Sequence, residues 1–216
     1  MLFLALSSLQ GRPMRSSFDE LARLPIDGVQ LTPGNVPQAG FRAHAEASCL
    51  ALRTHHGFDW ESRRRPVWEG ARLLVEADSV HPPAQDGSFE AWLDALIDPP
   101  ALEIMYPGHH LGCERELLLA MERRLWLAVD ISHAFIQLTQ GALTQSGWRR
   151  LMDYDRIAEI HASANDGKSD SHQPITAESF GLSWARSRRD PPLILESYFH
   201  KLSADQRQRQ IDLLRG

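Results

Sequence analysis

The stretch Ile160-His161-Ala162-Ser163-Ala164-Asn165-Asp166-Gly167-Lys168-Ser169-Asp170-Ser171-His172 directs the interpretation of the whole chain. A histidine ends an apolar segment typical of a strand, and a loop follows in which Asp170 and His172 are two residues apart. Imidazole and carboxylate groups are the ligands that borderline divalent metals prefer. Val129-Asp130-Ile131-Ser132-His133 precedes this stretch, and Leu193-Ile194-Leu195-Glu196 follows it. Together the three segments predict a metal site built from the ends of several strands.

Short apolar segments alternate with segments of helical periodicity along the chain. A strand followed by a helix, repeated eight times, predicts parallel strands with helical crossovers, and eight such units predict an α/β fold of the (β/α)8 TIM barrel type. The expected strands are Leu2–Leu9, Gly28–Thr32, Leu52–Phe58, Val75–His81, Ala101–Met105, Leu125–Ile131, Ile157–His161 and Leu193–Tyr198. The expected helices are Ser17–Leu24, opened by a capping box, then Gln38–Cys49, Ser88–Ile97, Cys113–Arg124, Thr144–Tyr154, Thr176–Arg186 and Ser203–Leu214.

The length of the chain limits how large such a barrel can be. TIM barrels typically need about 250 residues, and this chain has 216, so we expect one compact domain over 1–216 in which one unit lacks a proper helix. The segment Asp59–Arg72 is predicted to be irregular. A doubly wound open sheet is the alternative, but it calls for a glycine-rich phosphate turn after an early strand, and Ser7–Pro13 has no such pattern.

Composition excludes several classes of protein. Hydrophobic residues make up 43% and charged residues 24%, as in ordinary globular domains, and the net charge of −5 gives no bulk cationic field for nucleic acid. Two cysteines make no disulfide framework. No apolar segment approaches the roughly 20 residues of a membrane span. We therefore expect a cytoplasmic protein with no membrane contact.

Polar residues of ligand type stand at the ends of most expected strands. In a TIM barrel these ends carry the active site, and a charged residue inside an apolar strand, such as Glu196, needs a partner because buried charges are almost always paired. The candidate metal ligands are His55, His81, Glu103, Asp130, His133, His161, Asp170, His172 and Glu196.

Each of these residues also has an ordinary structural interpretation. A single histidine at a strand end is more often a hydrogen-bonded histidine than a ligand, so the case for a metal site rests on the whole set. Glu159 faces the same side of its strand as His161, and the sequence leaves open whether it is a ligand, a supporting group or part of a salt bridge. His109 and His110, between Gly108 and Gly112, are predicted to lie in a surface loop.

These motifs, in their order along nearly the whole chain, resemble the xylose isomerase-like TIM barrel superfamily, which includes sugar isomerases, epimerases and abasic-site nucleases of the endonuclease IV type. Asp130-Ile131-Ser132-His133-Ala134-Phe135 is similar to the nuclease's Asp-Thr-Cys-His-Ala-Phe, and Asp170-Ser171-His172 to its Asp-Arg-His loop. Pro192-Leu193-Ile194-Leu195-Glu196 matches its Pro-Leu-Ile-Leu-Glu strand. The resemblance implies that Glu103, Asp130, His161 and Glu196 form the core shared with mononuclear isomerases, and that the other ligands form a fuller, multinuclear set.

The first functional expectation is hydrolysis of a small phosphoester or related substrate by metal-activated water. Two or three divalent ions are the expected cofactors, zinc or iron, with manganese as an alternative. Glu103, His133 and Glu196 are the expected catalytic residues. One alternative is a multinuclear non-haem iron enzyme that oxidises a peptide or small molecule. Another is a mononuclear sugar isomerase or epimerase, and a metal-stabilised binding protein without turnover is a fourth.

The resemblance has clear departures. Abasic-site nucleases have longer loops that penetrate DNA, whereas the loops expected here are short, so we expect a small-molecule or peptide substrate rather than duplex DNA. His56, Trp60 and Arg63 are the candidate substrate-binding residues at a short lid. The sequence says nothing about a partner protein.

Overall fold

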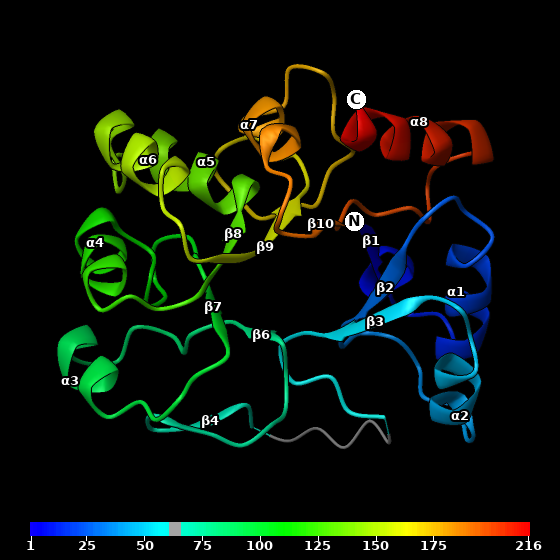
Figure 1. Cartoon of the computed structure of the whole chain (residues 1–216), viewed down its shortest axis with the longest axis horizontal. Helices are drawn as coiled ribbons and strands as arrows, with labels where there is room; N and C mark the ends of the chain where they lie inside the picture. The colour runs from blue at the N-terminus through cyan, green and yellow to red at the C-terminus, as the bar shows by residue number, and fades with distance from the viewer. Residues whose placement is uncertain (61–65) are drawn as a thin grey trace.

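The computed structural model describes residues 1–60 and 66–216, which form a (β/α)8 barrel with parallel strands at the centre and helices around them (Figure 1). The main sheet has eight strands in the order β3-β2-β1-β10-β9-β8-β7-β6. These strands are β1 (Leu2–Ala5), β2 (Gly28–Leu31), β3 (Ala51–Thr54), β6 (Ser79–Val80), β7 (Ala101–Glu103), β8 (Leu127–Asp130), β9 (Ile157–Ala162) and β10 (Leu193–Leu195).

The two outer strands of this sheet meet and close the barrel. His55, directly after β3, forms a parallel bridge with Ser79 of β6. The backbone amides of Asp78 and His56 donate to the carbonyls of Thr54 and Ser79, each at 3.0 Å. Closure removes exposed sheet edges and brings the carboxyl ends of all the strands to one rim.

Helices follow most of the strands and cover the outside of the barrel (Figure 1). The third unit differs, because a short antiparallel hairpin of β4 (Trp68–Glu69) and β5 (Arg72–Leu73) follows β3, and no helix occurs before β6 in the described residues. The barrel is confirmed, and in its described residues the third unit has this hairpin in place of a helix. The helices are α1 (Met14–Leu21), α2 (Phe41–Glu46), α3 (Phe89–Asp94), α4 (Glu114–Glu122), α5 (Ile131–Thr139), α6 (Gln145–Met152), α7 (Leu182–Ser187) and α8 (Ala204–Arg215).

The barrel interior has a small apolar core of its own, separate from the large one between strands and helices. Phe3, Ala5 and Ile194 form it and are buried. Gly28 is paired with Phe3 in the register of β1 and β2. A Cβ atom at Gly28 would lie 2.3 Å from a ring carbon of Phe3 and 2.4 Å from the carbonyl oxygen of Ala51. Only glycine therefore leaves room for the Phe3 ring.

Several elements differ in extent from the sequence-based expectation. Leu6–Leu9, expected to continue the first strand, forms a 3-10 helix, and only Ser79–Val80 of the expected strand Val75–His81 is a strand. The first helix begins at Met14 after Pro13, not at Ser17, whose side chain is buried within the helix. At this helix start the amide of Met14 donates to the carbonyl of Val36, and the amide of Arg15 donates to the side-chain oxygen of Gln38.

The largest correction concerns Ile131, which was expected to end a strand but begins α5. His133 therefore lies on a helix rather than at a strand end. In the part of the chain that the structure describes, no helix has the length and apolar character needed to cross a lipid bilayer.

Gly28→Ala should lower the free energy of unfolding by about 1–3 kcal/mol, the usual cost of overpacking a filled core. Urea denaturation followed by circular dichroism measures this change. Adding Phe3→Leu should recover only part of the loss, because the Ala51 carbonyl still opposes the new methyl group. An unchanged midpoint in Gly28→Ala would show that the interior is not packed around Phe3.

Candidate metal centre

Four of the expected ligand residues come together at the carboxyl rim of the barrel. Glu103 and Asp130 end β7 and β8, His161 lies in β9, and Glu196 directly follows β10. His161 Nδ1 is 3.3 Å from Glu103 Oε2 and 3.4 Å from Glu196 Oε1. Ligand atoms of Asp130, His161 and Glu196 all lie within 4.8 Å of one another. None of the four residues is more than 6% exposed.

The contacts of His161 in this group have the spacing expected around a single divalent ion. Ligand atoms about 2.0–2.2 Å from one ion lie about 3.0–3.6 Å from each other, which is the range of the contacts that His161 makes. Glu103 Oε2, Asp130 Oδ2 and His161 Nδ1 are buried and have no hydrogen-bond partner among the described residues. Buried polar atoms without partners cost free energy, and a cation would supply the missing interaction.

A second group shares Glu103. His55 Nε2 and His81 Nε2 are 2.9 Å apart, and each lies 3.3 Å from Glu103 Oε2. Such a triangle of two imidazole nitrogens and one carboxylate oxygen could hold a further ion beside the first. His81 is half-buried, with 30% of its side chain exposed, so this group lies nearest to solvent.

A third group gathers around Asp170 in the loop after β9. Asp170 Oδ2 lies 3.3 Å from His133 Nε2 and 3.2 Å from His172 Nε2. His133 Nδ1 donates a hydrogen bond of 2.9 Å to the carbonyl of Ile104, because a carbonyl can only accept. Its Nε2 is therefore free to bind a metal, which is the arrangement that ligating histidines usually show.

Asp130 joins the centre to the start of α5. Its Oδ1 accepts hydrogen bonds from the backbone amides of Ser132 at 2.6 Å and His133 at 3.1 Å, so it is the N-cap of the helix that carries His133. The cap uses one carboxylate oxygen, and Oδ2 remains for the metal group. One residue thus caps a helix and leaves an oxygen atom that could bind a metal ion.

Burial and charge give the two glutamates at the centre different proton affinities. Burial, with the neighbouring charge of Glu103, raises the pKa of Glu196 to about 7. Burial also acts to raise the pKa of Glu103, but the positive charges of His81 and His161 outweigh it, and that pKa lies well below its usual value. Two carboxyl groups whose environments separate their pKa values are the pattern that acid–base chemistry uses.

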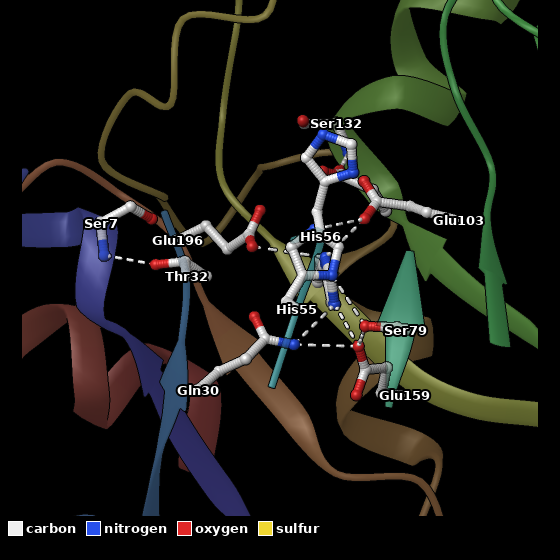
Figure 2. A network of polar contacts seen from close by, with 12 residues as sticks. Ser7, Gln30, Thr32, His55, His56, Ser79, Glu103, Ser132, Glu159 and Glu196 are labelled. Carbon is white, nitrogen blue, oxygen red and sulfur yellow. Dashed lines mark hydrogen bonds and ion pairs between the residues drawn. The ribbon is translucent and has the colours of Figure 1, made fainter. Parts of the chain in front are cut away.

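Glu159 lies beside this centre and is almost completely buried. Figure 2 shows it next to Ser79, Gln30 and the central histidines. Burial acts to raise its pKa, but the hydrogen bond from His161 and the charges of His161 and Arg53 lower the pKa to about 2. Glu159 is therefore ionised at neutral pH.

The candidate substrate-binding residues have different surroundings. The His56 ring stacks on His81 with a centroid distance of 3.9 Å, and burial lowers the pKa of His56 to about 3, so it is neutral. Trp60 packs against Phe41 and Phe58 and lines a cavity of about 1050 Å³ whose described lining includes no candidate ligand. Arg63 lies outside the described residues. A substrate role for these three residues remains a prediction.

The histidine pair 109–110 corrects the expectation of a surface loop. His110 is 1% exposed, and its ring stacks on Trp92 with a centroid distance of 5.1 Å. Sequence spacing alone gives no sign of this packing, because Trp92 comes from α3, far from His110 in the chain.

Comparison with solved structures finds a protein of the same architecture. This solved structure is titled "Crystal structure of D-tagatose 3-epimerase-like protein". The two sequences are 14% identical, and the match covers 100% of this chain and 96% of the other, with a TM-score of 0.66. The fold is a TIM barrel. At this identity the likeness shows the fold alone. No family model matches the sequence, and no curated protein matches it with significance.

The structure brings all nine candidate ligands to one end of the barrel in three adjoining groups. Sequence reasoning missed the residues that support them. Gln30 and Ser79 contact Glu159, and neither has a sequence signal beyond its place in a strand. Glu159 had a signal, since it is a charged residue in an apolar strand two positions from His161, but its partners could not be read from the sequence.

Asp130→Asn and Asp130→Ala should separate the two roles of this residue. Asparagine caps helices about as well as aspartate does, whereas alanine loses about 0.5–2 kcal/mol, so only Asp130→Ala should lower the free energy of unfolding in the presence of chelator. Both variants should bind a divalent ion more weakly. Urea denaturation and metal titration test the two effects, and equal stability of both variants would rule out the capping role.

Proposed function

We propose that this protein is a metal-dependent enzyme that acts on a small polar substrate at the carboxyl rim of the barrel. The observation that carries the proposal is the convergence of Glu103, Asp130, His161 and Glu196. His161 contacts the two glutamates at 3.3 Å and 3.4 Å, as around one ion, and ligand atoms of Asp130, His161 and Glu196 lie within 4.8 Å of one another. Such a buried set of carboxylates beside an imidazole, with unpaired ligand atoms, is a poor arrangement for a protein that binds no cation.

The reaction we propose is isomerisation or epimerisation of a small hydroxy-carbonyl compound, such as a ketose. A bound divalent ion would supply Lewis-acid polarisation of the substrate carbonyl. This reaction corresponds to the mononuclear alternative of the sequence analysis, and the epimerase-like title of the structure with the same fold supports it over the hydrolysis first expected.

Glu103 and Glu196 would have the proton-transfer role. Moving a proton between neighbouring carbons needs a group that accepts it on one side and a group that returns it. The two carboxylates come from different strands and both contact His161 Nδ1, at 3.3 Å and 3.4 Å, so a substrate bound beside that point could meet either one. His56, stacked on His81, is a neutral group suited to hydrogen-bonding a hydroxyl.

Incubation of a panel of ketoses, including tagatose, with Mn²⁺-loaded protein in D2O should introduce deuterium next to the carbonyl, as measured by proton NMR. Glu196→Gln should reduce this exchange by about 10²–10⁴-fold, the usual contribution of a general base. Glu116→Gln replaces another buried glutamate, one hydrogen-bonded to the Leu111 amide, and serves as the matched control. Absence of exchange with every ketose would count against isomerisation.

Hydrolysis of a small phosphoester is the second candidate, and a specific observation favours it. The groups around His81 and Asp170 offer ligands that a mononuclear reaction leaves without a role. Two or three ions about 3.5–4 Å apart can activate water and stabilise charge on a phosphoryl group.

The number of bound metal ions separates the two candidates. For isomerisation we expect one tightly bound ion per chain. This ion should be retained in Asp170→Ala and His172→Ala and lost in Glu196→Ala, because Glu196 is the one of these three residues that belongs to the four-residue group. Elemental analysis after dialysis measures this. Two or three zinc ions per chain, with one fewer in Asp170→Ala, would instead support hydrolysis, and bound iron would point to oxidation.

A further inference from the structure

Glu159 is a buried charge that the proposed reaction does not use. It lies in β9 two residues before His161, so both side chains point to the same face of the strand, into the barrel. Its exposed fraction is 0%, so its charge must be compensated entirely by protein groups.

Donors from four strands surround the Glu159 carboxylate. Oε1 accepts hydrogen bonds from Gln30 Nε2 at 2.9 Å, from His161 Nε2 at 2.7 Å and from the Ser79 hydroxyl. Oε2 accepts from Arg53 Nε at 2.6 Å. Ligand atoms of His55, Glu159 and His161 also lie within 4.8 Å of one another. The 2.7 Å between His161 Nε2 and Glu159 Oε1 is a hydrogen-bond distance, shorter than the roughly 3.0–3.6 Å between two ligands of one ion, so we assign Glu159 a supporting role.

The contact with His161 determines which of its nitrogens carries the proton. A carboxylate can only accept, so His161 Nε2 carries the hydrogen that it donates to Glu159. His161 Nδ1 lies 3.3 Å from Glu103 Oε2 and 3.4 Å from Glu196 Oε1, and with a divalent ion bound between them it would direct its lone pair to that ion. A carboxylate behind a ligating imidazole also makes the imidazole a stronger ligand.

The same carboxylate acts on His55 through Ser79. Because the Ser79 hydroxyl donates its hydrogen to Glu159, its oxygen is left to accept from His55 Nδ1 at 2.7 Å. His55 Nε2 is then free, and it faces His81 Nε2 and Glu103 Oε2. Figure 2 shows this chain of contacts, from Glu159 through Ser79 to the imidazole of His55.

We propose that Glu159 is a positioning residue that sets the ring orientation and proton location of two histidines at once, His161 directly and His55 through Ser79, so that both direct a lone pair into the metal centre. The inference deepens the proposed function and rests on it, because it assumes that the centre holds a divalent ion. Arg53 contributes by neutralising the buried carboxylate from the far side.

Glu159→Gln is the variant that tests this role with little change in shape. The amide offers one acceptor and two donors, so it cannot receive all the hydrogen bonds that the carboxylate receives. An amide nitrogen facing His161 Nε2 would favour a proton on Nδ1, the atom that points to the metal.

The expected result is a loss of about 10–100-fold in Zn²⁺ affinity, the range found for removal of groups that support a metal ligand. A competing chelator measures the affinity, and Glu116→Gln is the matched control with a wild-type value. ¹⁵N NMR of the histidine rings in the Zn²⁺-loaded protein should show Nε2–H for His161 and Nδ1–H for His55 in the wild type, and a changed proton location for both in Glu159→Gln. A merely structural role would lower stability without moving these signals.

Ser79→Ala separates the two branches. This variant should alter the ¹⁵N ring signals of His55. The ring signals of His161 and the Zn²⁺ affinity of the four-residue group should stay close to wild type. It also keeps the test decisive if Glu159→Gln fails to fold. Wild-type affinity and ring signals in Glu159→Gln, or an unaltered His55 in Ser79→Ala, would overturn the role of Glu159. Failure of the wild-type protein to take up Zn²⁺, Mn²⁺ or iron would instead overturn the proposed function itself.

Discussion

Many acidic and imidazole side chains are buried inside the closed barrel, and the structure depends on each of these charges having a partner of opposite sign. Parallel strands end on the same rim, so acids and imidazoles that are far apart in the chain meet there. Glu103, Asp130 and Glu196 would repel one another if they stood alone. Imidazoles between them reduce this repulsion, and His161, with Glu103 and Glu196 both within 3.4 Å of Nδ1, has its pKa raised despite burial. This is the basis of our proposal that a divalent cation completes the set.

The elements that build the barrel also shape the centre. Asp130 ends a strand, caps a helix with one oxygen and leaves the other for the metal group. The backbone of Ser79 closes the barrel through its bridge with His55. The Ser79 hydroxyl also connects Glu159 to the same histidine, because it donates to Glu159 and accepts from His55 Nδ1. A substitution at either position therefore acts on the fold and on the site together, which is why isosteric variants are more informative than alanine at these positions.

The incomplete third unit places an unusual surface next to the rim. Where other units have a helix, the described chain has the β4–β5 hairpin, and the Trp68 side chain donates from Nε1 to the carbonyl of His81 at 2.7 Å. His56 stacks on the same histidine. The side of the centre nearest solvent is thus held by a short hairpin and a stacked ring, consistent with access for a small substrate.

The sequence alone determined the fold class, the order of the eight strands and the set of candidate ligands, because apolar periodicity and charged residues in apolar strands are local signals. It did not give the helix that begins at Ile131, since Asp130-Ile131-Ser132-His133 suits either the end of a strand or a capped helix start, and only packing decides between them. The tertiary structure alone decided how the nine candidate ligands divide into three groups and what Glu159 contacts. Gln30, Arg53, Ser79 and His161 come from four different strands, and their meeting depends on strand register and barrel closure, which no local pattern encodes.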